Sequence, residues 1–167
     1  MEVLPDLVGA EPLVVFCGLA GAESTKTRDH YYETPGNNFW ESLHLSGFSP
    51  RQLRPEEDVA VVELGLGLTD LVGHWDPRWV EMDELVQKVA RWQPEWVAFT
   101  SKNVALEASR ALGRRGRPGL GVQDWYVDRA SVFVLPGTSG ANRRHDYDGR
   151  PNRLSWWRDL AALVGRA

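Results

Sequence analysis

Short apolar runs alternate along this chain with segments that resemble helices. The apolar runs, predicted as strands, fall at residues 13–18, 64–71, 96–100 and 131–135, and the predicted helices at 38–47, 81–92, 102–112 and 152–164. A strand followed by a helix and a second strand normally returns to the same sheet in parallel, through a right-handed crossover. The alternation therefore predicts an α/β fold, a three-layer α/β/α sandwich with a central, mainly parallel sheet of four or five strands.

The predicted helices end at residues that ordinarily stop helices. The segment 81–92 has acidic residues early and basic residues late, which suits the helix dipole, and Pro94 follows it. Gly113 closes the segment 102–112. Residues 122–127 are interpreted either as an edge strand or as an irregular segment. No repeat, linker or low-complexity stretch divides the chain, so we expect residues 1–167 to form one domain.

Charge is distributed unevenly between the two parts of the chain. Residues 1–100 contain 7 Lys and Arg against 17 Asp and Glu, a net charge of −10, whereas residues 101–167 contain 12 against 6, a net charge of +6. Arginine dominates the basic part, and its guanidinium fork matches the geometry of phosphate. The asymmetry indicates a polyanionic partner, and a solvated arginine-rich surface is the alternative.

Several classes of function lack their signatures here. The sequence has no Cys/His cluster with zinc spacing, no P-loop, no dinucleotide fingerprint and no GxSxG elbow, so we expect no metal and no cofactor. The single cysteine, Cys17, lies inside an apolar run and is expected to pack in the core. No leader-like segment or membrane-length apolar stretch occurs. We expect a cytoplasmic, nucleoid-associated monomer without a membrane partner.

Two polar loops follow predicted strands. The first, residues 18–40, contains two adjacent tyrosines and a Pro-Gly-Asn-Asn sequence, and the second, residues 136–143, reads PGTSGANR. In α/β proteins, ligands bind at the loops that leave the carboxyl ends of the strands. The two loops are therefore predicted to converge on one site. Their aromatic rings, amide side chains and flexible backbone suit a flat heterocyclic ligand.

Taken together, these loops resemble the two motifs of the uracil-DNA glycosylase superfamily, in its mismatch-specific uracil and thymine-DNA glycosylase branch. The first motif of that family has the form Gly-Ile-Asn-Pro-Gly after a buried strand, then Pro-x-Asn-x-Phe-Trp; residues 14–22 and 35–40 match it. The second, Leu-Pro-Asn-Pro-Ser-Gly, resembles residues 134–140. Residues 66–71 and 99–102 resemble two further strand ends of the family. The matching segments follow in order over nearly the whole chain.

The resemblance implies an enzyme that extrudes a base from DNA and cuts its N-glycosidic bond. Tyr32 corresponds to the ring that stacks on the base. The loop that reads the base and holds the water corresponds to a segment that includes Gly18, Leu19 and Ala20. The segment inserted into the duplex corresponds to Gly140, Ala141, Asn142 and Arg143. The implied substrate is DNA that contains uracil or mismatched bases.

The chain departs from this family where the water is activated. The activating asparagine of the first motif is replaced by Ala20, whose methyl group can neither accept a proton nor orient a water. Asp70 ends a predicted strand on the same sheet edge, and its carboxylate is the predicted catalytic replacement. A turn cap is the alternative role for Asp70. Glu23, Asp29 and His30 are rival candidates in the first loop.

The roles of the paired tyrosines and asparagines stay open on the sequence alone, as does the exact activity. Either tyrosine of the pair 31–32 is able to pack in the core instead of lining a site. Asn37 is a candidate for binding the base, but Asn37 and Asn38 can also cap the helix that begins at Phe39, and capping is favoured for Asn38. A non-catalytic DNA-binding relative that lost activity with the asparagine is the competing function. A glycosylase for xanthine or hypoxanthine is a third.

Overall fold

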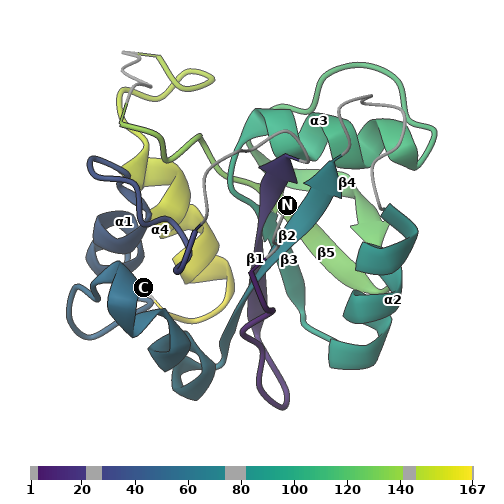
Figure 1. The fold of residues 1–167 in the computed structure, drawn as a ribbon. Helices are drawn as coiled ribbons and strands as arrows, with labels where there is room; N and C mark the ends of the chain where they lie inside the picture. The colour runs from purple at the N-terminus through teal and green to yellow at the C-terminus, as the bar shows by residue number, and fades with distance from the viewer. Residues whose placement is uncertain (1–3, 22–27, 74–81, 141–145, 167) are drawn as a thin grey trace.

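Helices cover both faces of a five-stranded sheet in the residues that the computed structural model describes, which are 4–21, 28–73, 82–140 and 146–166. The strand order is β2-β1-β3-β5-β4 (Figure 1). The strands are β1 (Val14–Gly21), β2 (Leu66–Gly73), β3 (Trp96–Phe99), β4 (Gly121–Val127) and β5 (Ala130–Val134). The helices are α1 (Phe39–Leu45), α2 (Met82–Trp92), α3 (Lys102–Ala111) and α4 (Leu154–Leu163), with a 3-10 segment η1 (Pro55–Leu64). The predicted α/β sandwich is confirmed.

The sheet is parallel except at one edge. Strand β1 pairs in parallel with β2 and β3, and β3 pairs in parallel with β5. Strand β4 pairs antiparallel with β5, so the segment left open at residues 122–127 is an edge strand. Only Asp128 and Arg129 separate β4 from β5, a connection far too short for the crossover that parallel pairing needs.

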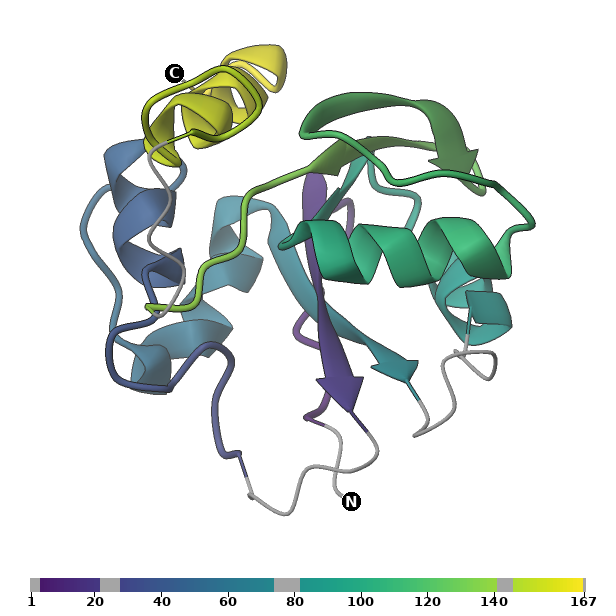
Figure 2. The same cartoon turned by 90° about the horizontal axis from the view of Figure 1, so that it is seen from above.

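Each face of the sheet has its own apolar core. On one face the ring of Phe16 stacks on Trp157 of α4 with centroids 5.5 Å apart and meets Phe39 of α1 edge-on. On the other face Cys17 packs in a cluster with Leu85 of α2. Neighbouring residues of a strand point to opposite faces, so Phe16 and Cys17 belong to different cores. Figure 2 shows α1 and α4 on one side of the sheet and α2 and α3 on the other.

The buried position of Cys17 confirms its predicted role in packing. Burial raises the pKa of its thiol, which keeps the group protonated and unreactive. Among the described helices, none is both long and apolar enough to cross a bilayer.

One element was not predicted from the sequence, and two strands end later than predicted, β1 at Gly21 and β2 at Gly73. The 3-10 segment Pro55–Leu64 was not predicted, because its residues do not repeat with the period of an α-helix. Strand β1 continues to Gly21, whereas the sequence placed the start of the first loop at Gly18. The ladder with β2 runs from Val14–Leu66 to Gly21–Gly73, and these extra pairs hold residues 18–21 as strand. Residues 18–21 thus belong to the strand, not to the polar loop.

Candidate active site

A cavity of about 560 Å³ opens at the carboxyl edge of the sheet. Its volume is in the range of sites for small molecules, which is roughly 300–1,000 Å³. Its walls come from the ends of β1, β2, β3 and β5, from the first loop, from the start of α3 and from the segment before α4. The lining residues are Gly18, Leu19, Arg28, Tyr32, Glu33, Thr34, Asn37, Asp70, Thr100, Ser101, Lys102, Asn103, Val104, Leu120, Pro136, Gly137, Thr138, Ser139, Tyr147 and Asp148.

Most of the predicted site residues of the first half meet in this cavity. Gly18, Leu19, Tyr32, Asn37 and Asp70 all line it. The structure leaves one of the predicted residues, that at position 20, outside this set. That residue is a buried alanine, held in the ladder opposite residue 72. The polar group that the family has at this position is therefore absent from the cavity wall, and any group that activates a water comes from another residue.

Asp70 lies directly beside Gly18 in the β1–β2 ladder. Its side chain is only 2% exposed, and its Oδ2 accepts a hydrogen bond from Nη2 of Arg28 at 2.7 Å. Its Oδ1 lies 2.8 Å from the point that a Cβ atom on Gly18 would occupy. The absence of a side chain at Gly18 is what lets this carboxylate approach the β1 backbone. The prediction that Asp70 lies at the carboxyl edge is confirmed.

The environment of Asp70 suits a group that takes up protons. Burial raises the pKa of Asp70 above the ordinary carboxyl value, and the hydrogen bond and charge of Arg28 oppose this rise. Asp6 raises the pKa further and Lys88 lowers it. General bases work best when their pKa lies near the working pH, and a perturbed carboxyl in a cavity is a physical signal of such a group.

The two adjacent tyrosines have different roles. Tyr31 is buried in the core, and its hydroxyl donates to the carbonyl of Pro5 at 2.9 Å. Tyr32 lines the cavity, where its hydroxyl lies 3.0 Å from Oγ1 of Thr100 and its ring stacks on Phe39 at 4.0 Å with an interplanar angle of 13°. Tyr32 also has a left-handed backbone with φ of 52°. Such a conformation costs a bulky residue roughly 1–3 kcal/mol and tends to occur at functional sites.

The side chain that caps the start of α1 belongs to Asn37 and not to Asn38. Oδ1 of Asn37 accepts from the N–H of Phe39 at 3.0 Å, whereas the side chain of Asn38 makes no capping hydrogen bond. Asn38 thus occupies the favoured N-cap position, but the capping hydrogen bond from a side chain comes from Asn37. Asn37 also lines the cavity, and its amide nitrogen still has two N–H donors, because Oδ1 alone makes the cap.

The two motif loops converge, as predicted. The N–H of Asn38 donates to the carbonyl of Thr138 at 2.9 Å. Gly140 packs so closely on the first loop that a Cβ atom there would lie 2.6 Å from the carbonyl oxygen of Gly36. Only glycine permits this approach of two backbones. Segments about a hundred residues apart in the sequence thus form one wall of the cavity.

Arg153, the residue just before α4, holds the second loop in place. Nη1 of Arg153 donates to the carbonyls of Gly137 and Ser139, at 3.1 and 3.2 Å. The Arg153 guanidinium therefore supports this loop. Of the segment predicted to enter the duplex, only Gly140 is described; Ala141, Asn142 and Arg143 lie outside the described residues.

The rival acids and bases of the first loop do not reach the cavity wall where they are described. Asp29 is exposed, and its backbone N–H donates to Glu33. Nδ1 of His30 lies 3.4 Å from Oδ1 of Asp58, and His30 does not line the cavity. Glu23 lies outside the described residues. Among the described candidates for activating water that the sequence proposed, Asp70 is the one that lines the cavity.

Arg28 was missed by the sequence interpretation. A buried carboxylate needs a partner of opposite charge, and the first loop contains only two candidates, Lys26 and Arg28. Once Asp70 is assigned to the site, its need for a cationic partner therefore limits that partner in the first loop to Lys26 or Arg28. Nothing local indicated the ion pair of Lys102 with Asp148, whose Nζ and Oδ1 lie 2.5 Å apart at the far wall of the cavity.

In the described ranges, no three His, Cys, Asp or Glu side chains gather into an arrangement that would hold a metal ion. The polar groups of the cavity are instead three carboxylates, hydroxyls, two amides and two cations. They can position a small polar molecule and accept a proton from it.

Comparison with known families agrees with this geometry. The model of the Uracil DNA glycosylase superfamily matches residues 5–161, which include both motif loops, the whole sheet and α4 up to Ala161. The family acts on DNA, and its members are generally DNA glycosylases. Because the match covers nearly the whole chain, the protein belongs to the uracil DNA glycosylase superfamily.

Proposed function

We propose that this protein excises uracil from DNA by hydrolysing the N-glycosidic bond, as a member of the mismatch-specific uracil and thymine-DNA glycosylase branch. The observation that carries the proposal is the buried Asp70 carboxylate in the same cavity as the Tyr32 ring. An extruded base and its sugar need both a stacking surface and an anionic group nearby. The cavity offers the two together.

The base binds between Tyr32 and the amide of Asn37. Phe39 covers one face of the Tyr32 ring, so a flat base stacks on the opposite face. Base–aromatic stacking is worth about 1–3 kcal/mol. The amide N–H groups of Asn37 donate to a carbonyl of the base. Uracil has a carbonyl where cytosine has an amino group, so this donor favours a deaminated base.

Asp70 supplies the group that activates the water, which Ala20 cannot supply. A water bound near its Oδ1 attacks C1′ of the sugar, the bond from C1′ to the base nitrogen breaks, and the bonding electrons leave with the base. The proton of the water passes to the carboxylate. Before the attack is complete, the negative charge of Asp70 stabilises the positive charge that develops on the sugar. Arg28 keeps Oδ2 occupied, which leaves Oδ1 for the water.

The segment from Gly140 to Arg143 enters the duplex and fills the space that the base leaves. We expect Arg143 to contact phosphate, so that removing it weakens binding to DNA of any sequence and flattens the salt dependence. The protein acts as a monomer in the cytoplasm, close to the nucleoid, and the reaction as proposed uses no metal or cofactor.

The replacement of the family asparagine by Ala20 favours one other function, a DNA-binding relative without activity. Single-turnover cleavage of oligonucleotides that contain uracil, xanthine or hypoxanthine, followed by alkali, separates the possibilities. We expect product from uracil with the wild type, and a rate at least about 100-fold lower with Asp70→Asn, since a positioned acid–base group contributes about 10²–10⁴-fold. DNA binding stays intact, because other groups hold the base.

Asp29→Asn is the matched control, because it removes an exposed carboxylate from the first loop and should leave the rate unchanged. Loss of cleavage in Glu23→Gln or His30→Ala, with a normal rate in Asp70→Asn, would move the chemistry into the first loop. Tight binding by the wild type without any product would identify the non-catalytic relative.

A further inference from the structure

Exposed arginines without an acidic partner gather on the end of α3 and the connection to β4. In the parts of the chain that the structure describes, Arg110, Arg115 and Arg117 are exposed and form no ion pair. Other arginines are neutralised by carboxylates, as Arg51 is by Glu57. Within the connection itself, only Arg114 has such a partner, Asp124, at 2.8 Å. Three cations therefore remain uncompensated on one short stretch.

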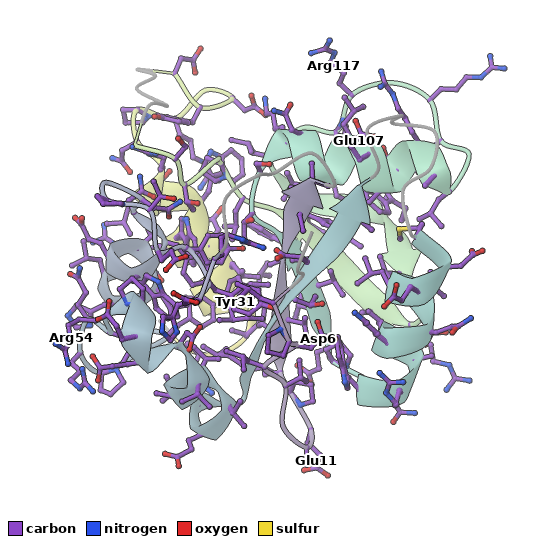
Figure 3. All side chains as sticks on the ribbon, in the orientation of Figure 1. Asp6, Glu11, Tyr31, Arg54, Glu107 and Arg117 are labelled. Carbon is purple, nitrogen blue, oxygen red and sulfur yellow. The ribbon has the colours of Figure 1, made fainter. Side chains whose placement is uncertain are left out.

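This stretch ends at the cavity. Leu120 lines the cavity wall, and its N–H donates to Oδ2 of Asp148 at 2.8 Å, which ties the connection to the segment before α4. The next residue, Gly121, pairs with Val134 at the carboxyl end of β5. Figure 3 shows Arg117 projecting from the end of the molecule toward which β1 and β2 point. Arg117 thus lies on the same side of the molecule as the cavity.

We propose that Arg110, Arg115 and Arg117 form a docking surface for the backbone phosphates of the DNA that flanks the extruded base. The surface rests on the proposed function for the identity of its ligand, and it is separate from the segment that enters the duplex. The guanidinium fork binds phosphate oxygens in two places at once. Contacts of this kind orient a duplex without reading its sequence. The surface therefore adds affinity and register to an overall acidic protein.

The position of the surface predicts how much flanking DNA it needs. Arg110 lies eight residues beyond Lys102 along α3, and Lys102 lines the cavity. At 1.5 Å per residue this separation is about 12 Å, or roughly three to four base pairs at 3.4 Å each. DNA that ends two base pairs from the extruded base does not reach Arg110.

The chain offers a matched control at the opposite edge of the sheet. Arg91 in the last turn of α2 and Arg129 in the β4–β5 turn are also exposed and form no ion pair with described residues. They precede β3 and β5, and so lie toward the amino ends of these strands. The double variants Arg115→Met/Arg117→Met and Arg91→Met/Arg129→Met remove the same charge from the two edges.

The test is fluorescence anisotropy across a salt series, with a duplex of about twenty base pairs that carries a central tetrahydrofuran abasic analogue. We expect Arg115→Met/Arg117→Met to weaken binding about tenfold or more and to reduce the slope of log K against log salt by about 1.8, which is two phosphate contacts at 0.9 each. The control variant binds as the wild type does. Equal weakening in both variants, or no weakening in the first, overturns the proposal.

A second duplex tests the placement of the surface. It has two base pairs on each side of the same analogue and is closed by a non-nucleotide linker. On this probe the wild type and Arg110→Met, a variant that should weaken binding to the longer duplex, should bind alike; a persisting difference overturns the predicted distance. Thermal unfolding of the variants should match the wild type, since the side chains are exposed. Cleavage of uracil DNA is measured in parallel. If no cleavage occurs but binding still depends on these arginines, the glycosylase proposal is contradicted and the docking-surface proposal is supported.

Discussion

The guanidinium of Arg28 lies 2.7 Å from the carboxylate of Asp70, a residue 42 positions later in the chain. Asp70 is almost fully buried, and burial alone pushes its pKa upward. Arg28 opposes this shift by donating to Oδ2 and by its positive charge. The protonation state of the cavity carboxylate thus depends on a cation that the first loop brings to it.

Removing this cation should change the pH dependence of cleavage. In Arg28→Met, desolvation of Asp70 is no longer opposed, so the pKa of Asp70 rises further. A smaller fraction of the protein then carries the ionised carboxylate at any given acidic or neutral pH. We expect the acid limb of the pH–rate profile to move to higher pH, measured by single-turnover cleavage. Arg114→Met, which breaks an exposed pair with Asp124, is the control with an unmoved profile. If the acid limb does not move, Arg28 does not control the ionisation of the group on which cleavage depends.

The same carboxylate should weaken the fold at neutral pH. Because the pKa of Asp70 is raised in the folded state, the folded protein binds the proton more tightly than the unfolded chain does. Stability is therefore lost as the pH rises through this range. Asp70→Asn removes the buried charge, and we expect a higher Tm at pH 7–8, by roughly 2–4 °C for each kcal/mol. The gain should vanish near pH 3, below the ordinary carboxyl pKa of about 3.9. A lower Tm at pH 7–8 contradicts this account.

Tyr32 should contribute to turnover through its ring. Tyr32→Ala removes the stacking surface, worth about 1–3 kcal/mol, and should lower the cleavage rate by about one to two powers of ten. Tyr32→Phe is the matched variant, because it keeps the ring and loses only the contact between the hydroxyl and Thr100. It should keep most of the rate. An unchanged rate in Tyr32→Ala would show that the base does not stack on this ring.

Gly18 should tolerate no side chain. In Gly18→Ala the new methyl group would lie 2.8 Å from Oδ1 of Asp70 and 3.0 Å from the hydroxyl of Tyr32, so at least one of these groups must move. We expect the rate to fall by about tenfold or more, since small displacements of catalytic groups are costly. Gly67→Ala crowds the apolar side chain of Val8 at 2.9 Å, outside the cavity. Comparable activity of the two variants, per folded molecule, would speak against the placement of Asp70.

The sequence alone predicted much of the layout, because that part depends on local patterns. Apolar runs, helix-ending glycines and the proline at 94 give the order of strands and helices through the preferences of neighbouring residues. The rule that ligands bind at the carboxyl ends of strands then placed Asp70 and both loops at one edge. The antiparallel β4 stayed open, because an edge strand carries only a weak apolar pattern.

Contacts between side chains were decided by the tertiary structure. The sequence offered both tyrosines and both asparagines, and only the packed chain shows that Tyr32 lines the cavity and Asn37 caps α1. It also brings Arg28 to Asp70. Such contacts depend on the strand order β2-β1-β3 and on the register that sets Gly18 opposite Asp70. Order and register arise from packing across the whole sheet, so no local pattern of residues determines which side chains meet.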